Sequence, residues 1–332
     1  MSGCAWMIKG MVTGEDIEAA AERIAPHVRR TPVMRLERGA FGVDAAVSLK
    51  LELFQHTGSF KPRGAFNHIL CTDVPAAGVI TASGGNHGQA VAYVARTLGI
   101  PAEIFVPEGS PPLKAERIRR QKAHVTVTGR YYDDAMDACL ERARESGAFL
   151  VHPYDHEQVV AGAGTAGREI EEQLPELDTI LVAVGGGGLA GGVAAWYASR
   201  RRVVSVEPEG CPALAAAREA GEPVEVPVGG IAADSLGARR IGKVPFAVAR
   251  EHVAASVLVP DEAILEAQWL LWDGYRILAE PGGAASLAAL LCGAYRPEPA
   301  ESVGVVICGG NTAAVPEPGE GGSCVTNRGK PA

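Results

Sequence analysis

One lysine lies in a turn broken by glycine and proline, in the segment TGSFKPRGA of residues 57–65. Pro62 ends any preceding regular hydrogen bonding and can begin a helix, so we expect Lys61 at the mouth of a helix formed by RGAFNHIL. The positive end of that helix and the apolar Phe60 lower the pKa of an ammonium group, as imine formation requires. On this segment alone, an ordinary surface lysine is the better interpretation.

A second segment, TASGGNHGQAVAYVARTLG, ends a strand in a Ser-Gly-Gly-Asn turn and begins a long helix near Asn86. Free backbone N–H groups and the side chains of Ser83 and Asn86 therefore converge on one spot. That spot suits a carboxylate or a phenolic oxygen. A plain helix cap is the commoner explanation of such a turn taken alone.

The segment TILVAVGGGGLAGGVAAWYA has four glycines between a strand and a helix, where backbone amides can hold a phosphate. Gly186, Gly188 and Gly191 also satisfy GxGxxG. Glu207, at the end of VVSVEP, lies where a dinucleotide fold places its ribose-binding acid. A nicotinamide-dependent oxidoreductase is thus a serious alternative on this segment. A phosphate loop explains the four glycines at least as well, because the motif follows a complete α/β block.

Two further segments carry a side chain that can meet a ligand. In VGVVICGGNTAAV a strand ends at Cys308 and a Gly-Gly-Asn turn. A thiol with an ordinary pKa of roughly 8.5 contacts a ligand atom without carrying charge, although a merely buried cysteine is the default explanation. In AEPGGAASLAALL, Glu280 precedes a Pro-Gly-Gly turn and an apolar helix, so it either caps that helix or faces a cleft.

Short apolar runs alternate with helical stretches from Ala45 onward, such as GVITA followed by NHGQAVAYVARTLG and DTILVAV followed by LAGGVAAWYASR. Strands separated by helices of this length predict βαβ units, parallel sheets and ligands at the carboxyl ends of the strands. We therefore predict an α/β fold of two lobes, each a mostly parallel twisted sheet flanked by helices.

The alternating pattern forms two blocks, which predict two domains with a cleft between them. Residues 72–152 form the predicted small, mobile domain. Residues 1–71 plus 153–315 form the predicted large domain, with a boundary soft by several residues. Residues 316–332 have no apolar period and are predicted to be a loose tail.

Composition narrows the partners and the compartment. The chain has 332 residues, a formal net charge of -8 and a pI near 5.6, so it has no general attraction for nucleic acids or anionic membranes. Seven scattered cysteines without a CxxC pair predict reduced thiols in the cytoplasm. No apolar stretch approaches the ~18 residues of a membrane helix, and the start lacks the apolar core of a signal peptide.

Each of these segments, taken alone, has an ordinary structural explanation. Such explanations do not account for the order and spacing of all five. SFKPRGA, SGGNHGQ, VGGGGL, EPGGA and CGGN, in that order, resemble the pyridoxal-phosphate (PLP) enzymes of the tryptophan synthase β-like group. Within that group they are similar to the threonine/serine dehydratases and serine racemases. The resemblance runs from about Thr31 to Val315. It implies the two-lobed PLP fold with the cofactor in the large domain, a small amino acid substrate and a homodimer.

The resemblance also implies a role for each motif. Lys61 would hold the cofactor as an imine, Asn86 would bond its ring hydroxyl, and Cys308 would face its pyridine nitrogen. The other implied cofactor contacts are Phe60, Gly185, Gly186, Gly187, Gly188, Leu189 and Glu280, of which the glycines and Leu189 would cradle the phosphate through backbone N–H groups. The implied substrate contacts are Ser83, Gly84, Gly85 and His87.

The implied reaction is β-elimination from L-threonine and/or L-serine, with Lys61 as general base, to give a 2-oxo acid and ammonia. A serine racemase and a 3-hydroxyaspartate ammonia-lyase remain alternatives. More remote are an NAD(P)-dependent oxidoreductase and a non-catalytic small-molecule sensor. His152, Arg239 and Arg240 either recognise a second substrate carboxylate or have structural roles.

Two departures from the family pattern narrow these expectations. Racemases of the group carry a second serine where this chain has Gly84, and glycine has no proton to give, so inversion is disfavoured. Racemase-like members bind a divalent ion through an acid after VEP and another about six residues later. Here Glu207 remains but Ala213 occupies the later position, so a divalent ion is disfavoured, and the nearby Glu209 leaves it open as an alternative. No room remains after Asn311 for a regulatory domain, so feedback control by isoleucine is not expected.

Overall fold

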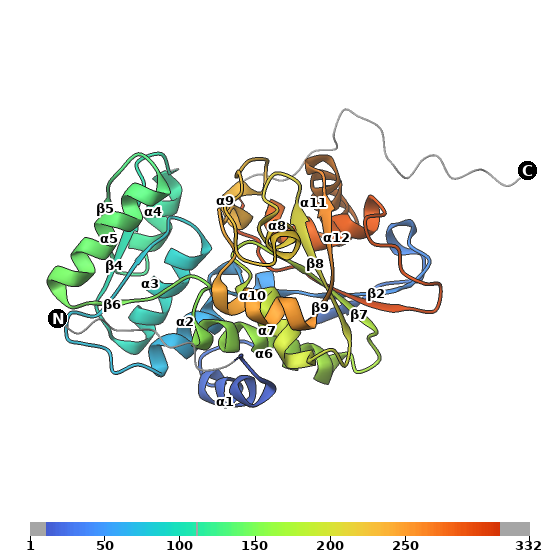
Figure 1. The fold of residues 1–332 in the computed structure, drawn as a ribbon, viewed down its shortest axis with the longest axis horizontal. Coiled ribbons are helices and arrows are strands. Elements are labelled where there is room, and N and C mark those ends of the chain that lie inside the picture. Colours follow the sequence, from blue (N-terminus) through green and yellow to red (C-terminus); the bar gives the residue numbers. More distant parts are fainter. Residues whose placement is uncertain (1–10, 111, 313–332) are drawn as a thin grey trace, which may run out of the picture.

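The computed structural model describes residues 11–110 and 112–312, which form two β-sheets and the helices around them (Figure 1). The larger sheet has six strands in the order β1 (Val33–Arg35), β2 (Ala46–Lys50), β10 (Ser302–Val306), β7 (Thr179–Ala183), β8 (Arg202–Pro208) and β9 (Val253–Val259). All neighbours in it are parallel except β1 and β2. The segment that carries Cys308 therefore follows a central strand of this sheet.

The smaller sheet is parallel throughout, in the order β5 (His124–Val127), β4 (Ala102–Val106), β3 (Val79–Ala82) and β6 (Phe149–Leu150). Its helices are α3 (Asn86–Leu98), α4 (Pro112–Arg119) and α5 (Tyr132–Ser146). They lie with this sheet on the left of Figure 1. Two lobes with parallel sheets are what the alternating sequence pattern predicts.

The remaining helices lie with the larger sheet or between the two sheets. They are α1 (Gly14–Ile24), α2 (Lys61–Leu70), α6 (Glu157–Gln173), α7 (Gly188–Tyr197), α8 (Ala213–Ala220), α9 (Ala233–Leu236), α10 (Lys243–His252), α11 (Asp261–Tyr275) and α12 (Pro281–Leu291). Short 3₁₀ turns occur at η1 (Ala40–Gly42), η2 (Glu52–Phe54) and η3 (His56–Gly58).

Helices α2, α6 and α7 pack closely because glycines stand where they cross. A Cβ on Gly64 of α2 would lie 2.9 Å from the carbonyl oxygen of Val159 in α6. A Cβ on Gly192 of α7 would lie 2.5 Å from the backbone nitrogen of Gly164 in α6. Real Cβ atoms do not approach backbone this closely, so the glycines set the distance between these helices.

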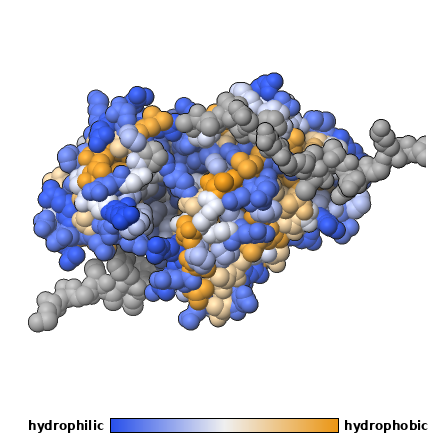
Figure 2. Space-filling model, turned by 90° about the horizontal axis from the view of Figure 1, so that it is seen from above, coloured by the Kyte–Doolittle hydropathy of each residue, from blue (hydrophilic) through white to orange (hydrophobic). Residues whose placement is uncertain are grey.

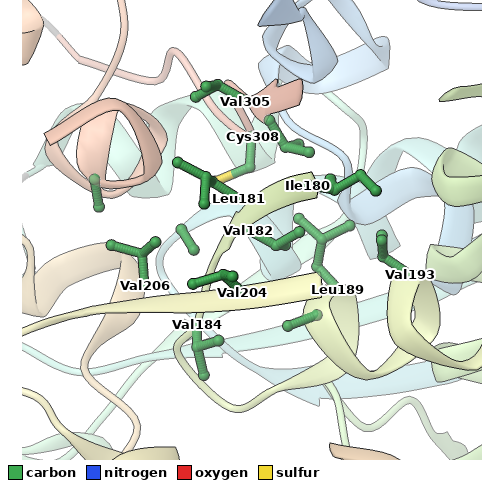
Figure 3. Close-up of a cluster of buried hydrophobic side chains, with 14 of the residues drawn as sticks. Ile180, Leu181, Val182, Val184, Leu189, Val193, Val204, Val206, Val305 and Cys308 are labelled. Atoms are coloured by element: carbon green, nitrogen blue, oxygen red, sulfur yellow. The ribbon is translucent and has the colours of Figure 1, made fainter. Parts of the chain in front are cut away.

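The core of the larger lobe is built around β7 and β8, whose inner residues are fully buried. Figure 3 shows Leu181, Val182 and Val204 of these strands packed with Leu189 of α7 and with Cys308. A strand buried on both faces has a continuous apolar sequence, as TILVAV does. The face shown in Figure 2 is mostly hydrophilic, with separate apolar patches.

The structure agrees with the predicted fold class. The division into residues 1–71 plus 153–315 and residues 72–152 stays a prediction, and the predicted tail, residues 316–332, lies outside the described residues. Within the described part of the chain, none of the helices has the length and apolar character needed to cross a membrane.

Candidate active site

A cleft of about 570 Å³ lies between the two sheets, and half of the predicted cofactor and substrate contacts line it. One wall comes from the smaller lobe, at the carboxyl end of β3 and the start of α3. The other wall comes from the start of α2 and the segments around α7 and α9. The predicted residues on these walls are Lys61, Ser83, Gly84, Gly85, Asn86, His87 and Gly186.

Lys61 is the first residue of α2, as its place before Pro62 predicts. Its Nζ donates to the carbonyl oxygen of Pro153 at 3.1 Å and lies 5.0 Å from the centroid of the Phe60 ring. Burial lowers the pKa of this amine from 10.5 to about 8. A lysine that loses its proton this readily can act as a nucleophile and as a base.

A buried ionic network fixes the start of α2. The Arg63 guanidinium donates to Glu52 and to Glu169, each at 2.8 Å, and the ammonium of Lys50 donates to Glu169 at 2.7 Å. Arg63 is 1% exposed and Glu52 is fully buried, so removing one partner would leave a buried charge uncompensated. Lys61, two residues before Arg63, is thereby held in place.

The turn before α3 presents backbone N–H groups to the cleft. Gly85 is the N-cap of α3, and its N–H donates to Ser83 Oγ at 3.2 Å. The first N–H groups of a helix have no partner within the helix and favour an anion. Gly84 lines the same wall, where a Cβ would lie 3.0 Å from Ser110 Oγ. The arrangement can hold a carboxylate.

His87 belongs to the same wall, but its ring is already bonded. His87 is 5% exposed, and its Nε2 lies 2.9 Å from the carbonyl oxygen of Val151. Because a carbonyl only accepts, Nε2 carries the proton. Burial, with the Lys61 charge adding to it, lowers the His87 pKa to about 3, so the ring is neutral.

The four glycines form the turn between β7 and α7, with Gly187 at φ +92° and Gly188 as the first helical residue. A Cβ on Gly186 would lie 2.2 Å from the ring of Tyr154, and one on Gly187 would lie 2.4 Å from Ile241. Side chains are therefore excluded here, and the backbone N–H groups at the helix start are left for a bound anion.

Gly185 and Leu189, at the two ends of the predicted phosphate-binding segment, offer no side chain to a ligand. Leu189 packs its side chain into the core of the larger lobe (Figure 3). A Cβ on Gly185 would lie 3.0 Å from Leu236. Only backbone groups of these two residues are available to a ligand.

Glu280 faces the N-terminal end of α3 rather than capping its own helix. It is the N-cap residue of α12 but makes no side-chain cap bond there. Its Oε1 accepts from Asn86 Nδ2 at 2.5 Å. Burial raises the pKa of this carboxyl to about 7, and the hydrogen bond from Asn86 opposes that rise.

Cys308 lies two residues beyond β10 and is 5% exposed. Its thiol donates to the carbonyl oxygen of Gly282 at 3.4 Å. Burial raises its pKa to about 12, with the Glu280 charge adding to the rise, so the thiol is neutral.

Some residues near the site were not singled out from the sequence. Asn311 donates through Nδ2 to Asn86 Oδ1 at 2.7 Å, and the ring of Tyr154 lies over the glycine turn. Lys114 of α4 forms an ion pair with Asp234 of α9 across the cleft. The asparagine of CGGN was a usable signal, because it follows a strand and a glycine turn as Asn86 does. The others depend on how the two lobes face each other.

Glu207 is occupied by its own surroundings. It is fully buried, and its two oxygens accept from the backbone N–H groups of Leu214 and Ala215 at 2.7 and 2.8 Å. Both carboxylate oxygens are thus used at the start of α8, and Glu207 is not among the residues that line the cleft, which argues against a ribose-binding role. Over the described residues, no cluster of three or more His, Cys, Asp or Glu side chains could hold a metal ion.

The three residues considered for binding a second substrate carboxylate, Arg239, Arg240 and His152, lie in different environments. Arg239 and Arg240 line the cleft, and Arg239 lies 3.5 Å from Asp133 of the smaller lobe. His152 accepts from the N–H groups of Tyr154 and Asp155. Burial lowers its pKa to about 4, so it is neutral and carries no charge to attract a carboxylate.

Comparisons with known proteins point to one family of enzymes. The family described as "Pyridoxal-phosphate dependent enzyme" matches residues 24–309. An L-threonine ammonia-lyase from Geobacter sulfurreducens is 38% identical over 83% of this chain and 70% of its own length. The structure of maize serine racemase aligns with a TM-score of 0.86 and 34% identity, over 92% of this chain and 95% of that one. The structure of a threonine deaminase from T.th. aligns with a TM-score of 0.85 and 35% identity, over 92% of this chain and 100% of that one.

The chain belongs to the family of pyridoxal-phosphate-dependent enzymes, and its fold is the tryptophan synthase β-like PLP fold. The cleft fits the family's cofactor. It offers an amine with a lowered pKa and a glycine turn whose Cβ positions are closed. The neutral thiol of Cys308 is not among the residues that line the cleft, but it lies close enough to Lys61 to influence the pKa of the amine.

Proposed function

We propose that this protein is an ammonia-lyase that converts L-threonine and/or L-serine to a 2-oxo acid and ammonia. The observation that carries the proposal is the Lys61 amine, whose pKa is lowered to about 8 in a cleft shared with the glycine turn and the start of α3. The similarity to the threonine ammonia-lyase and the threonine deaminase supports the substrate class.

In this proposal, PLP bound to Lys61 supplies an electron sink that acidifies the α-proton of the amino acid. The other proposed cofactor contacts are the N–H groups from Gly185 to Leu189 for the phosphate, Asn86 for the ring hydroxyl, Cys308 for the ring nitrogen, and Phe60 and Glu280 beside them. The Cys308 thiol is neutral and a much weaker acid than a carboxyl group, so in this proposal the ring nitrogen has no strong acid beside it.

The substrate is positioned by the opposite wall. Its carboxylate is bound by the N–H groups at the start of α3, with Ser83, Gly84, Gly85 and His87 around it. The released amine of Lys61 takes the α-proton, since an amine with a pKa near 8 is partly neutral at physiological pH. Loss of the β-hydroxyl group and hydrolysis of the product then give one 2-oxo acid and one ammonia.

The first test is an absorption spectrum of the purified protein, followed by addition of L-threonine or L-serine and an assay for 2-oxo acid. We expect a visible band of lysine-bound cofactor in the wild type, with product formed. Lys61→Ala should lose both the band and at least ~10³-fold in rate, because base and nucleophile are removed together. Turnover by a folded Lys61→Ala protein would exclude the assignment.

The pH dependence of cofactor uptake tests the environment of Lys61. Only the neutral amine attacks the cofactor aldehyde. The uptake rate of the apoprotein should therefore rise with pH through a midpoint near 8, the pKa of Lys61. A midpoint near 10.5, the ordinary lysine value, would mean that the amine is exposed to water.

A racemase is the second candidate, and one contact favours it. Ser110 Oγ lies 3.0 Å from the point where a Cβ of Gly84 would stand, so a hydroxyl is present on that wall. Chiral analysis of serine after incubation separates the two activities. Appearance of D-serine would establish racemisation beside elimination. A 3-hydroxyaspartate ammonia-lyase would need Arg239 or Arg240 to bind the second carboxylate.

We further propose a homodimer in the cytoplasm, with residues 72–152 as a domain that moves against the rest. The five described cysteines are free thiols, which suits a reducing compartment. Light scattering after size exclusion measures the assembly. A divalent ion is not part of the proposal, because both oxygens of Glu207 are used within the chain.

A further inference from the structure

We propose that Asn311 is a positioning residue that fixes which way the Asn86 side-chain amide faces, so that Asn86 presents N–H groups to the cofactor and to Glu280. This inference rests on the proposed function of Asn86. It concerns a residue to which the sequence motifs gave no role.

The first step is the orientation of Asn311 itself. One end of its side-chain amide lies 2.7 Å from the carbonyl oxygen of Thr57 and 2.7 Å from the side chain of Asn86. The oxygen and nitrogen of an amide have nearly the same shape, so orientation must follow from the partners. A backbone carbonyl only accepts hydrogen bonds, so the atom of Asn311 that faces Thr57 is Nδ2.

The second step passes this orientation to Asn86. The nitrogen of Asn311 has two hydrogens, one for Thr57 and one for Asn86. The atom of Asn86 that receives the second hydrogen is Oδ1. The NH₂ group of Asn86 must then face the other way, where it donates to Glu280 and borders the cleft.

Glu280 cannot set this orientation alone. Burial raises the pKa of its carboxyl to about 7, so near neutral pH it exists in both protonation states. The ionised form only accepts a hydrogen bond, whereas the protonated form can also donate one. Asn86 could face Glu280 with either end of its amide, and the contact with Asn311 removes that choice.

The contact also ties the site to the turn before Lys61. Thr57 has φ +61° and Gly58 has φ +76°, and a Cβ on Gly58 would lie 2.8 Å from Asn311 Oδ1. The N–H of Gly310 donates to the carbonyl of Gly58 at 2.9 Å. The segment after β10 therefore holds the turn of the predicted nucleophile and the amide of Asn86 together.

The test uses Asn311→Asp, which keeps the shape but replaces a donor by an ionised acceptor. The new carboxylate would accept from the NH₂ of Asn86 and turn the Asn86 oxygen toward the cleft. We expect the dissociation constant of PLP, measured by titrating the apoprotein, to rise about tenfold, the effect of losing one hydrogen bond. The pH midpoint of the absorption band of the bound cofactor should shift as well.

The matched control is Asn67→Asp. Asn67 is a fully buried asparagine of α2 whose side chain bonds to Arg23 and Gln158 outside the cleft. It should lower the melting temperature of the apoprotein while leaving cofactor affinity and band midpoint unchanged. If Asn311→Asp does not fold, Asn311→Ser replaces the NH₂ group by a shorter hydroxyl that cannot serve both Thr57 and Asn86, without adding charge, and about threefold weaker binding is expected.

The outcomes separate this inference from the proposed function. A wild-type protein that binds no PLP would overturn both. A wild type that binds PLP, with an Asn311→Asp or Asn311→Ser protein of the same affinity and the same band midpoint, would overturn only the role of Asn311. If Asn311→Asp and Asn67→Asp weaken PLP binding equally, the proposed role of Asn311 is also overturned.

Discussion

At Lys61 and Glu280 the protein buries two groups of opposite charge in one site, and burial moves their pKa values toward each other. The amine falls to about 8 and the carboxyl rises to about 7. At physiological pH each group is therefore poised between its charged and neutral forms, the condition in which proton transfer is easiest. Asn86 donates a hydrogen bond to Glu280 and is also a proposed cofactor contact. It therefore connects the Glu280 carboxyl to the proposed cofactor.

The raised pKa of Glu280 predicts how stability changes with pH. In the unfolded chain this carboxyl loses its proton near pH 4.5, whereas in the folded protein it keeps the proton up to about pH 7. The ionised carboxylate is disfavoured by burial, so the apoprotein loses stability as pH rises through that window. Glu280→Gln has no proton to lose and should avoid this loss.

We therefore expect the Glu280→Gln apoprotein to be more stable than the wild type at about pH 8, by about 3 kcal/mol. At pH 4.5, the ordinary pKa of the carboxyl, the two should differ little. Urea unfolding of both apoproteins at the two pH values measures this. An equal difference at both pH values would mean that Glu280 titrates normally and that the substitution acts through packing alone.

At the scale of the elements, glycines decide how closely α2, α6 and α7 approach, and these helices hold Lys61 and the glycine turn. The crossing of α6 and α7 is the tightest case. Gly192 has backbone of both Gly164 and Val160 within 2.5 Å of the place of a Cβ. Backbone cannot swing aside as a side chain can, so the helices must separate if a methyl group is added.

Gly192→Ala should destabilise the protein by about 2 to 4 kcal/mol and weaken PLP binding, because α7 begins at the glycine turn. Gly274→Ala in α11 is the control, since no atom lies within 4 Å of its Cβ position. That change should stabilise the protein by about 0.5 to 1 kcal/mol, as alanine favours a helix over glycine. Thermal unfolding of both variants decides whether the crossing is as tight as described.

Local sequence signals predicted the positions of site residues that depend on only one or two neighbouring elements. Pro62 placed Lys61 at the start of α2, and the Ser-Gly-Gly-Asn turn placed Asn86 at the start of α3. Glu280 was left with two possible directions, because its partner Asn86 is 194 residues away in the chain. For Asn311 the CGGN turn was a usable signal of position, but its partners Thr57 and Asn86 could not be predicted, because only the folded chain brings them beside it.

At the scale of the molecule, two ion pairs join the lobes across the cleft. Lys114 pairs with Asp234, and Arg239 lies 3.5 Å from Asp133. Most of these side chains are exposed, so each pair contributes at most about 1 kcal/mol to global stability. We expect their effect to fall instead on the proposed movement of residues 72–152, because both pairs bridge the cleft.

The double variant Asp133→Asn with Asp234→Asn should shift the lobes toward the open arrangement. We expect KM for the amino acid to rise several-fold, with less than about 1 kcal/mol change in the free energy of unfolding. The dependence of KM on salt should also weaken, because salt screens the wild-type pairs. Asp44→Asn breaks an exposed pair with Arg38 within one lobe and should change none of these quantities. An equal change in the control would assign the effect to surface charge in general.

The place of β10 in the larger sheet has a consequence for how the protein is made. β10 is the last strand of the described chain, yet it lies between β2 and β7. While the ribosome is still adding residues before Ser302, the β1–β2 pair and the β7–β8–β9 group have no strand to join them, and their facing edges are open to other chains. The smaller sheet has no such gap and can fold first. We therefore expect the larger lobe to be the last part of the nascent protein to become protected from aggregation, and a chain that stops before Ser302 to be prone to aggregate and to lack Cys308 and Asn311.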